Sequence, residues 1–206
     1  MINHIFPQKI CSGKISDKAL CIYLDQDKKY VLAALKAILK TAYLCPVSSD
    51  RVKINKQIGF FANSDTNYSS STIKQCLRND PTLENYLKPD FIIPEAKAYI
   101  NFVRDIAGRD DRYSYAQMVT FLWANDYLYL KWAERCSNYL GSLPSESQKK
   151  YQTIAELYSN ENMRQWVSLL EEQVNKTAAS LDEVSSIFKM VAKHEFLFFE
   201  GCNRYD

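Results

Sequence analysis

Three acidic residues are the side chains of this sequence best placed to do chemistry. Glu195 interrupts a row that is otherwise apolar at helical spacing, and Asp27 and Asp126 interrupt two similar rows. Such a row faces the core of a helical protein. An ionised carboxylate without a partner there is strongly destabilising, so each of the three needs partners or a function. The row around Glu195 contains Val184, Phe188, Val191, Phe198 and Cys202.

Two interpretations of these carboxylates remain open. A helical row drawn from sequence carries a small error in phase, so any single carboxylate could lie beside the core face rather than on it. A shared polar pocket is the better account of all three together. Carboxylates enclosed by aromatic side chains have a pKa that is easily shifted, which suits general acid–base catalysis and recognition of amino groups.

Aromatic residues lie near the carboxylates on the expected helices and would suit the binding of a flat heterocycle. Plain core packing is the alternative for each of them and the better account of most. They are Tyr30, Tyr99, Trp123, Tyr127, Tyr129, Phe198 and Phe199.

Other catalytic and metal chemistries find little support in the sequence. His194 adjoins Glu195 but faces about 100° away on a helix, so we expect an outer-face or interface residue. His4 as a haem ligand would need a glycine-rich distal segment, and two histidines cannot build a histidine-rich metal site. No residue marks a serine triad. We therefore expect no metal and no cofactor.

The composition is that of an ordinary soluble chain, with 206 residues, 47% hydrophobic and 24% charged. A net charge of +2 points to neither a nucleic-acid partner nor a membrane surface. No long apolar run and no basic leader segment occur, so we expect a cytoplasmic protein with no membrane contact. The length is within reach of one domain, and we expect one that spans residues 1–206.

The six cysteines are scattered along the chain without a CxxC pair. Because no secretion signal precedes them, we expect reduced thiols, most of them small core residues. They are Cys11, Cys21, Cys45, Cys76, Cys136 and Cys202.

Glycine and proline are scarce, and glycine-rich phosphate loops and Asn-Gly turns are absent, which predicts an all-α helical bundle. Ser16 and the Ser180-x-x-Glu183 capping box mark helix starts. Residues 48–92 are the least legible stretch, with short helices expected over 72–78 and 81–87. The other expected helices cover about 2–12, 17–45, 94–107, 115–140, 145–158, 160–178 and 181 to the end.

Several segments resemble a known family in the right order and spacing. His4-x-Phe6, Gly13 and Tyr23-Leu24-x-Gln26-Asp27-x-x-Tyr30 resemble the opening of the TenA, or thiaminase II, family of aminopyrimidine hydrolases. His194-Glu195-Phe196-x-Phe198-Phe199 resembles its Y-E-x-x-F-W signature, and residues 151–167 resemble its later helix pair. The match is poorest over 48–92.

The resemblance implies an all-helical, haem-oxygenase-like bundle without haem that forms a homodimer or homotetramer. It also implies a small aminopyrimidine as substrate. Asp27 would bind the aminopyrimidine edge, Tyr30 would flank the ring and Tyr99 would line the pocket. Tyr158 would hydrogen-bond the catalytic carboxylate, and Glu195 would be the acid/base. The further ring contacts would come from Trp123, Tyr127 and Phe198.

One departure from the family pattern matters. Thiaminase-type members carry a nucleophilic cysteine, and here its position is occupied by Trp123 or Asn125, neither of which is a nucleophile. A second branch lacks that cysteine and has a tryptophan followed one turn later by a carboxylate, a part that Asp126 could take. That branch salvages degraded thiamin pyrimidines. We therefore expect deamination of 4-amino-5-aminomethyl-2-methylpyrimidine, or of its N-formyl precursor, by a carboxylate pair.

Two other functions are consistent with the same scaffold. A catalytically inactive member would keep the pocket and serve as a binding, regulatory or interaction protein. A quinone-cofactor oxidase would need a basic, histidine-rich pocket, and the presence of only two histidines argues against it. The position of Asp126 relative to Glu195 distinguishes the enzyme from the binding protein, because hydrolysis by this pair requires both side chains to converge on one cavity.

Overall fold

The computed structural model describes residues 2–62, 68–108, 111–140 and 145–206, and its regular elements there are all helical. The prediction of an all-α chain is thus confirmed. The expected helix over 72–78 begins earlier, at Tyr68, and residues 48–62 also form a helix. The elements are α1 (Ile5–Cys11), α2 (Asp17–Leu44), α3 (Ser48–Ala62), α4 (Tyr68–Asn79), the 3-10 helix η2 (Pro81–Tyr86), α5 (Pro94–Ile106), α6 (Tyr115–Leu140), α7 (Ser145–Ser159), α8 (Glu161–Lys176) and α9 (Leu181–Asn203).

Local capping chemistry sets several of these helix ends. The Ser16 side chain accepts a hydrogen bond from the backbone of Ala19 at the start of α2. Ser180 and Glu183 form a reciprocal capping box at the start of α9. Gly13 follows α1 with a φ of 67°, a left-handed conformation that glycine adopts without strain. These helix ends lie where the sequence predicts them, because a capping interaction involves only residues close together in the sequence.

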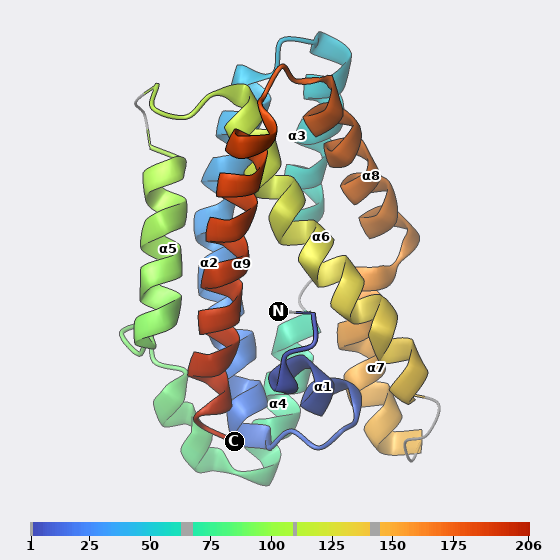
Figure 1. The fold of residues 1–206 in the computed structure, drawn as a ribbon. Helices are drawn as coiled ribbons and strands as arrows, with labels where there is room; N and C mark the ends of the chain where they lie inside the picture. The colour runs from blue at the N-terminus through green and yellow to red at the C-terminus, as the bar shows by residue number, and fades with distance from the viewer. Residues whose placement is uncertain (1, 63–67, 109–110, 141–144) are drawn as a thin grey trace.

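Four long helices bring the central side chains together. Figure 1 shows α2, α5 and α9 running side by side, with α6 crossing at a tilt toward α7 and α8. Contacts join α2 to α5, α6 and α9, and α9 to α5 and α6. The middle of the bundle is therefore enclosed by four helices. Among the described residues, no helix combines the length and apolar run needed to cross a membrane.

A disulfide ties α1 to α6. Cys11 and Cys136 are bonded, with Cα atoms 4.9 Å apart and 125 positions between them in sequence. The prediction of reduced thiols is therefore wrong for this pair, because a pairing made by tertiary structure leaves no signal in the local spacing. The remaining cysteines lie outside this disulfide and are buried, as expected for small core residues: Cys21, Cys45, Cys76 and Cys202.

Candidate active site

Gln26 and Asp27 on α2 face two different parts of the structure. The Gln26 amide donates to the carbonyl of Phe91 at 3.0 Å and accepts from the backbone N–H of Ile93 at 3.1 Å. These two bonds fix the segment that leads into α5. Asp27 is buried, and its Oδ2 accepts a hydrogen bond from the Tyr158 hydroxyl at 3.1 Å. One dipeptide thus positions a neighbouring helix and places a carboxylate in the core.

Glu195 lies in the middle of the bundle with 0% of its surface exposed. Its Oε1 accepts from the Tyr99 hydroxyl at 2.8 Å and from Asn125 Nδ2 at 2.7 Å. Asn125 Nδ2 also donates to the Tyr99 hydroxyl oxygen at 2.8 Å, and Tyr30 donates to the same oxygen at 3.3 Å. Glu195 Oε2 has no hydrogen-bond partner among the described residues. We call Asp27, Tyr30, Tyr99, Asn125, Tyr129, Tyr158 and Glu195 the Glu195 cluster.

The surroundings of Glu195 favour its neutral form. Burial raises the pKa of Glu195 from 4.5 to about 8, and the nearby charge of Asp27 acts in the same direction. The hydrogen bonds from Tyr99 and Asn125 and the nearby Tyr129 hydroxyl oppose that rise by favouring the ionised form. At neutral pH most molecules therefore carry a proton on Glu195. A carboxyl group with a pKa near the ambient pH can give up a proton and take one back.

Asp126 lies at the edge of this cluster. It is half-buried, and its Oδ2 accepts a hydrogen bond from Trp166 Nε1 of α8 at 2.7 Å. Burial raises the pKa of Asp126 to about 7, and the Trp166 bond opposes that rise. The charge of Asp126 also raises the pKa of Tyr30, so the carboxylate is close to the cluster. The structure thus gives Asp126 a partner on α8 and leaves it within electrostatic reach of the site.

The sequence matches the model of the TENA/THI-4/PQQC family over residues 1–205. The chain belongs to this family. A TenA homologue from P. horikoshii OT3 is 20% identical, with 100% of this chain and 92% of that chain covered and a TM-score of 0.77. A TenA-like thiaminase from Sulfolobus solfataricus P2 is 18% identical, with coverages of 100% and 90% and a TM-score of 0.71. A TenA homologue from Pyrococcus furiosus is 19% identical, with coverages of 98% and 92% and a TM-score of 0.68.

At these identities the structural likeness establishes the fold, which is that of TenA proteins. No curated protein matched the sequence. The family membership agrees with the resemblance drawn from the opening and closing motifs.

In this TENA/THI-4/PQQC chain, the hydrogen bonds to Glu195 differ from the expectation. Tyr158 was expected to bond the catalytic carboxylate, but its hydroxyl donates to Asp27. The bonds to Glu195 come from Tyr99 and Asn125. Asn125 lies about 100° around α6 from the Asp126 row, and a polar residue in such a place is ordinarily solvent-facing. The packing of α5 and α9 against α6 gives its amide two buried partners, Tyr99 and Glu195.

The remaining predicted ring contacts are less central. The Trp123 ring contacts Tyr127 at 5.3 Å and Phe188 at 5.6 Å between centroids, forming a half-buried aromatic edge. Phe198 is buried in the core, with its ring 5.7 Å from that of Tyr23. Phe198 therefore packs in the core, and no contact with the Glu195 cluster distinguishes it as a binding residue.

His194 is not on an outer face. Its ring lies parallel to Tyr99 at 5.1 Å and to Phe102 at 4.7 Å, so it fills the contact between α9 and α5. Burial lowers the pKa of His194, with a smaller contribution from the charge of Lys193. A neutral imidazole stacked on Tyr99 supports the position of the tyrosine that bonds Glu195.

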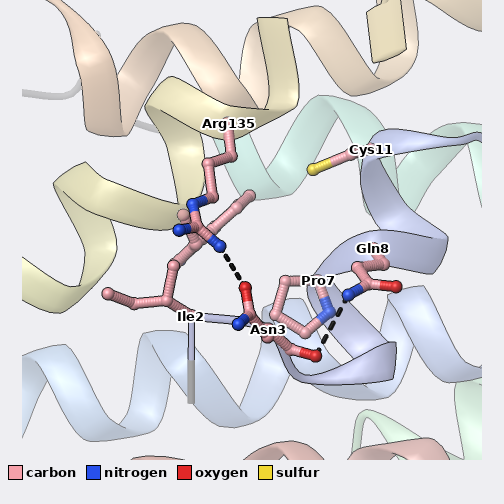
Figure 2. A pocket seen from close by; sticks show the side chains of 7 residues that line it. Ile2, Asn3, Pro7, Gln8, Cys11 and Arg135 are labelled. Carbon is pink, nitrogen blue, oxygen red and sulfur yellow. Dashed lines mark hydrogen bonds between the residues drawn. The ribbon is translucent and has the colours of Figure 1, made fainter. Parts of the chain in front are cut away.

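A pocket of about 270 Å³ lies between α1 and α6 (Figure 2). Its lining residue Trp132 separates it from the Glu195 cluster and contacts the rings of Tyr129 and Tyr158. Arg135 reaches across the pocket and donates to the Asn3 side chain, and Gln8 donates to the Asn3 carbonyl at 3.0 Å. The described lining contains no carboxylate, so this pocket offers none of the acid–base chemistry of the cluster. Its lining residues are Ile2, Asn3, Pro7, Gln8, Cys11, Trp132 and Arg135. Within the described part of the chain, no group of histidine, cysteine, aspartate and glutamate side chains could hold a metal ion.

Proposed function

We propose that this chain is a hydrolase that deaminates 4-amino-5-aminomethyl-2-methylpyrimidine, or its N-formyl precursor, in the salvage of thiamin pyrimidines. The observation that carries the proposal is Glu195, a fully buried carboxyl with one oxygen bonded twice and a pKa raised to about 8. Such a group is suited to proton transfer at neutral pH. Membership of the TENA/THI-4/PQQC family and the aromatic surroundings support a flat pyrimidine as the substrate.

The proposed reaction replaces the amino group of the 5-aminomethyl substituent with a hydroxyl group. Water attacks the methylene carbon of the aminomethyl group, and the carbon–nitrogen bond breaks. The products are the hydroxymethylpyrimidine and ammonia, or formamide when the N-formyl precursor is the substrate. Glu195 gives its proton to the departing amine, and Asp126 at the edge of the cluster takes a proton from the water. Asp27 binds the aminopyrimidine edge, Tyr30 flanks the ring and Tyr99 lines the pocket. Each role follows the resemblance and rests on the geometry of the cluster.

Water, rather than a thiolate, is the nucleophile in this proposal. The residue that faces Glu195 from α6 is Asn125, which has no nucleophilic atom. Cys202 lies on the same face of α9 as Glu195, but it is fully buried, and burial raises the pKa of its thiol well above the usual value. A protonated thiol is a poor nucleophile. Cys202→Ala should therefore retain turnover, whereas loss of turnover in a folded variant would point to a covalent mechanism.

The decisive experiment is mass spectrometry of the aminomethylpyrimidine and its N-formyl precursor after incubation with the wild-type chain and with Glu195→Gln. Conversion to the hydroxymethyl product by the wild type alone is the expected result. Calorimetric titration with the same compounds distinguishes an enzyme from a protein that only binds them. Binding without turnover of either compound by the wild type would favour a catalytically inactive binding protein, for which the absence of a nucleophile at Asn125 is the supporting observation.

A further inference from the structure

Asn125 makes a closed set of hydrogen bonds with two partners. Its Nδ2 donates to Glu195 Oε1 at 2.7 Å and to the Tyr99 hydroxyl oxygen at 2.8 Å, and Tyr99 itself donates to Oε1 at 2.8 Å. Both atoms near Nδ2 are oxygens that accept, which fixes the orientation of the amide. Two side chains, one from α5 and one from α6, thus hold one oxygen of Glu195 on α9 from two directions.

The two oxygens of Glu195 are therefore unequal. Oε1 receives two donors, while Oε2 meets no donor in the part of the chain that the structure describes. An oxygen that accepts two hydrogen bonds carries the carbonyl or anionic character of the group, and the proton of a neutral carboxyl goes to the other oxygen. The arrangement places the acidic proton on Oε2.

We propose that Asn125 is a positioning residue that, together with Tyr99, anchors Oε1 of Glu195 and so makes Oε2 the oxygen that exchanges protons with the substrate. The inference rests on the proposed function and names the atom through which Glu195 acts. It also gives a role to Asn125, one of the two residues that could occupy the position of the family's nucleophilic cysteine. Asn125 acts through Glu195 and touches no reacting atom itself.

Several other groups influence the titration of Glu195, so the effect of Asn125 has to be separated from theirs. Asp27 raises the pKa of Glu195, and the bond from Tyr99 and the nearby Tyr129 hydroxyl lower it, as Asn125 does. Tyr30 bonds Tyr99, and the Cys202 thiol lies within electrostatic reach along α9. Substitution of Asn125 removes one donor from Oε1 and one from the Tyr99 hydroxyl oxygen, which weakens Tyr99 as a donor to Oε1 as well. The remaining change has one direction, which is toward the neutral form of Glu195.

The test uses Asn125→Ala and Asn125→Leu in the full chain. Titration of the Glu195 carboxyl by carbon-13 NMR, assigned with Glu195→Gln, should show a higher midpoint in both variants than in the wild type. Leucine nearly fills the volume of asparagine, so a result common to both variants cannot be due to a cavity. With the aminomethylpyrimidine, kcat should fall by about 10- to 100-fold while KM changes by less than about 3-fold. The matched control is Gln173→Ala, which removes a buried amide outside the site and should leave both readouts unchanged.

The outcomes separate this inference from the proposed function. A raised midpoint in both Asn125 variants, with kcat lowered and KM kept, supports the positioning role. An unchanged midpoint overturns it, whatever the activity. A raised midpoint in a protein whose wild type turns over neither pyrimidine supports the anchoring of Oε1 by Asn125 and overturns the proposed reaction.

Discussion

Two carboxyl groups in this bundle are each bonded by an amide side chain, yet they differ in charge. Asp50 of α3 retains 5% exposure, and its Oδ2 accepts from Gln173 of α8 at 2.9 Å. Its Oδ1 accepts from Lys53 at 3.2 Å, and Gln173 in turn accepts from the Tyr115 hydroxyl at 3.0 Å. We call Asp50, Lys53, Tyr115 and Gln173 the Asp50 cluster. The bond from Gln173, together with Lys53, holds the pKa of Asp50 below its usual range.

Asp50 and Glu195 differ in the hydrogen bonding of their two carboxyl oxygens and in the charge of the nearest ionisable side chain. Both oxygens of Asp50 have donors, and Lys53 compensates the negative charge. Glu195 has two donors on one oxygen, and Asp27 is the charged neighbour that raises its pKa. A fully bonded and compensated carboxylate stabilises a fold, whereas a half-bonded one costs stability and is available for proton transfer. The comparison separates a structural carboxylate from a reactive one on physical grounds.

The largest expected effect concerns turnover. Glu195→Gln should lower kcat on the aminomethylpyrimidine by about 10²- to 10⁴-fold, the range typical for loss of a general acid or base. Asp50→Asn should leave kcat within about 2-fold, because Asp50 lies outside the site. Steady-state kinetics on both variants, with folding checked by circular dichroism, makes the measurement. Equal loss of activity in a folded Asp50→Asn variant would break the comparison.

The pH dependence of stability should have opposite signs in the two clusters. The pKa of Glu195 is raised on folding, so its contribution is complete below pH 4.5 and is lost as the pH rises toward about 8. The unfolding free energy of the wild type should therefore fall relative to that of Glu195→Gln over that range, by roughly 4 kcal/mol. The pKa of Asp50 is lowered, so its contribution is present above about pH 4 and is lost in more acidic solution.

Urea unfolding at a series of pH values measures both trends. The free-energy difference between wild type and Asp50→Asn should shrink only on the acid side. A Glu195→Gln difference that stays flat between pH 5 and about 8 would mean that Glu195 remains ionised in the folded chain.

The sequence predicts much of the Glu195 cluster but nothing of the Asp50 cluster. The apolar rows around Asp27 and Glu195 predict their burial, because helical periodicity is a local property. Nothing in the sequence marks Asp50, because its amide partner Gln173 lies 123 positions away on another helix. Asn125 was recognised only as a possible cysteine position, since its bond to Glu195 depends on how α6 packs against α9. The Cys11–Cys136 bond likewise depends on tertiary packing over 125 positions.

A smaller effect is expected from removing the amide that bonds Asp50. Gln173→Ala should lower the free energy of unfolding by about 2 kcal/mol, because it removes a hydrogen bond to a charged group and takes the partner of the Tyr115 hydroxyl. Asn125→Ala should cost less, about 1 kcal/mol, since Glu195 is mostly neutral and keeps Tyr99. Urea midpoints at neutral pH give both values. A larger loss for Asn125→Ala would show that the Glu195 cluster is the more important to stability.

The smallest expected effects come from a matched pair of tyrosines, each one step removed from its carboxyl group. Tyr30 bonds Tyr99, which bonds Glu195, and Tyr115 bonds Gln173, which bonds Asp50. Tyr30→Phe and Tyr115→Phe should each lower the free energy of unfolding by about 1 kcal/mol or less, because each removes one hydroxyl bond.

The two tyrosine variants should differ in their kinetics. Loss of the Tyr30 hydroxyl removes one hydrogen bond from the oxygen of Tyr99 and so weakens Tyr99 as a donor to Glu195. The pKa of Glu195 should rise, and the pH profile of kcat should shift to higher pH. Tyr115→Phe should leave that profile in place, since its hydroxyl bonds Gln173 in the Asp50 cluster. Profiles recorded on the same substrate between about pH 6 and 10, a range that brackets the Glu195 titration, distinguish them. An equal shift in both variants would mean that the clusters are coupled through α6, which carries both Tyr115 and Asn125.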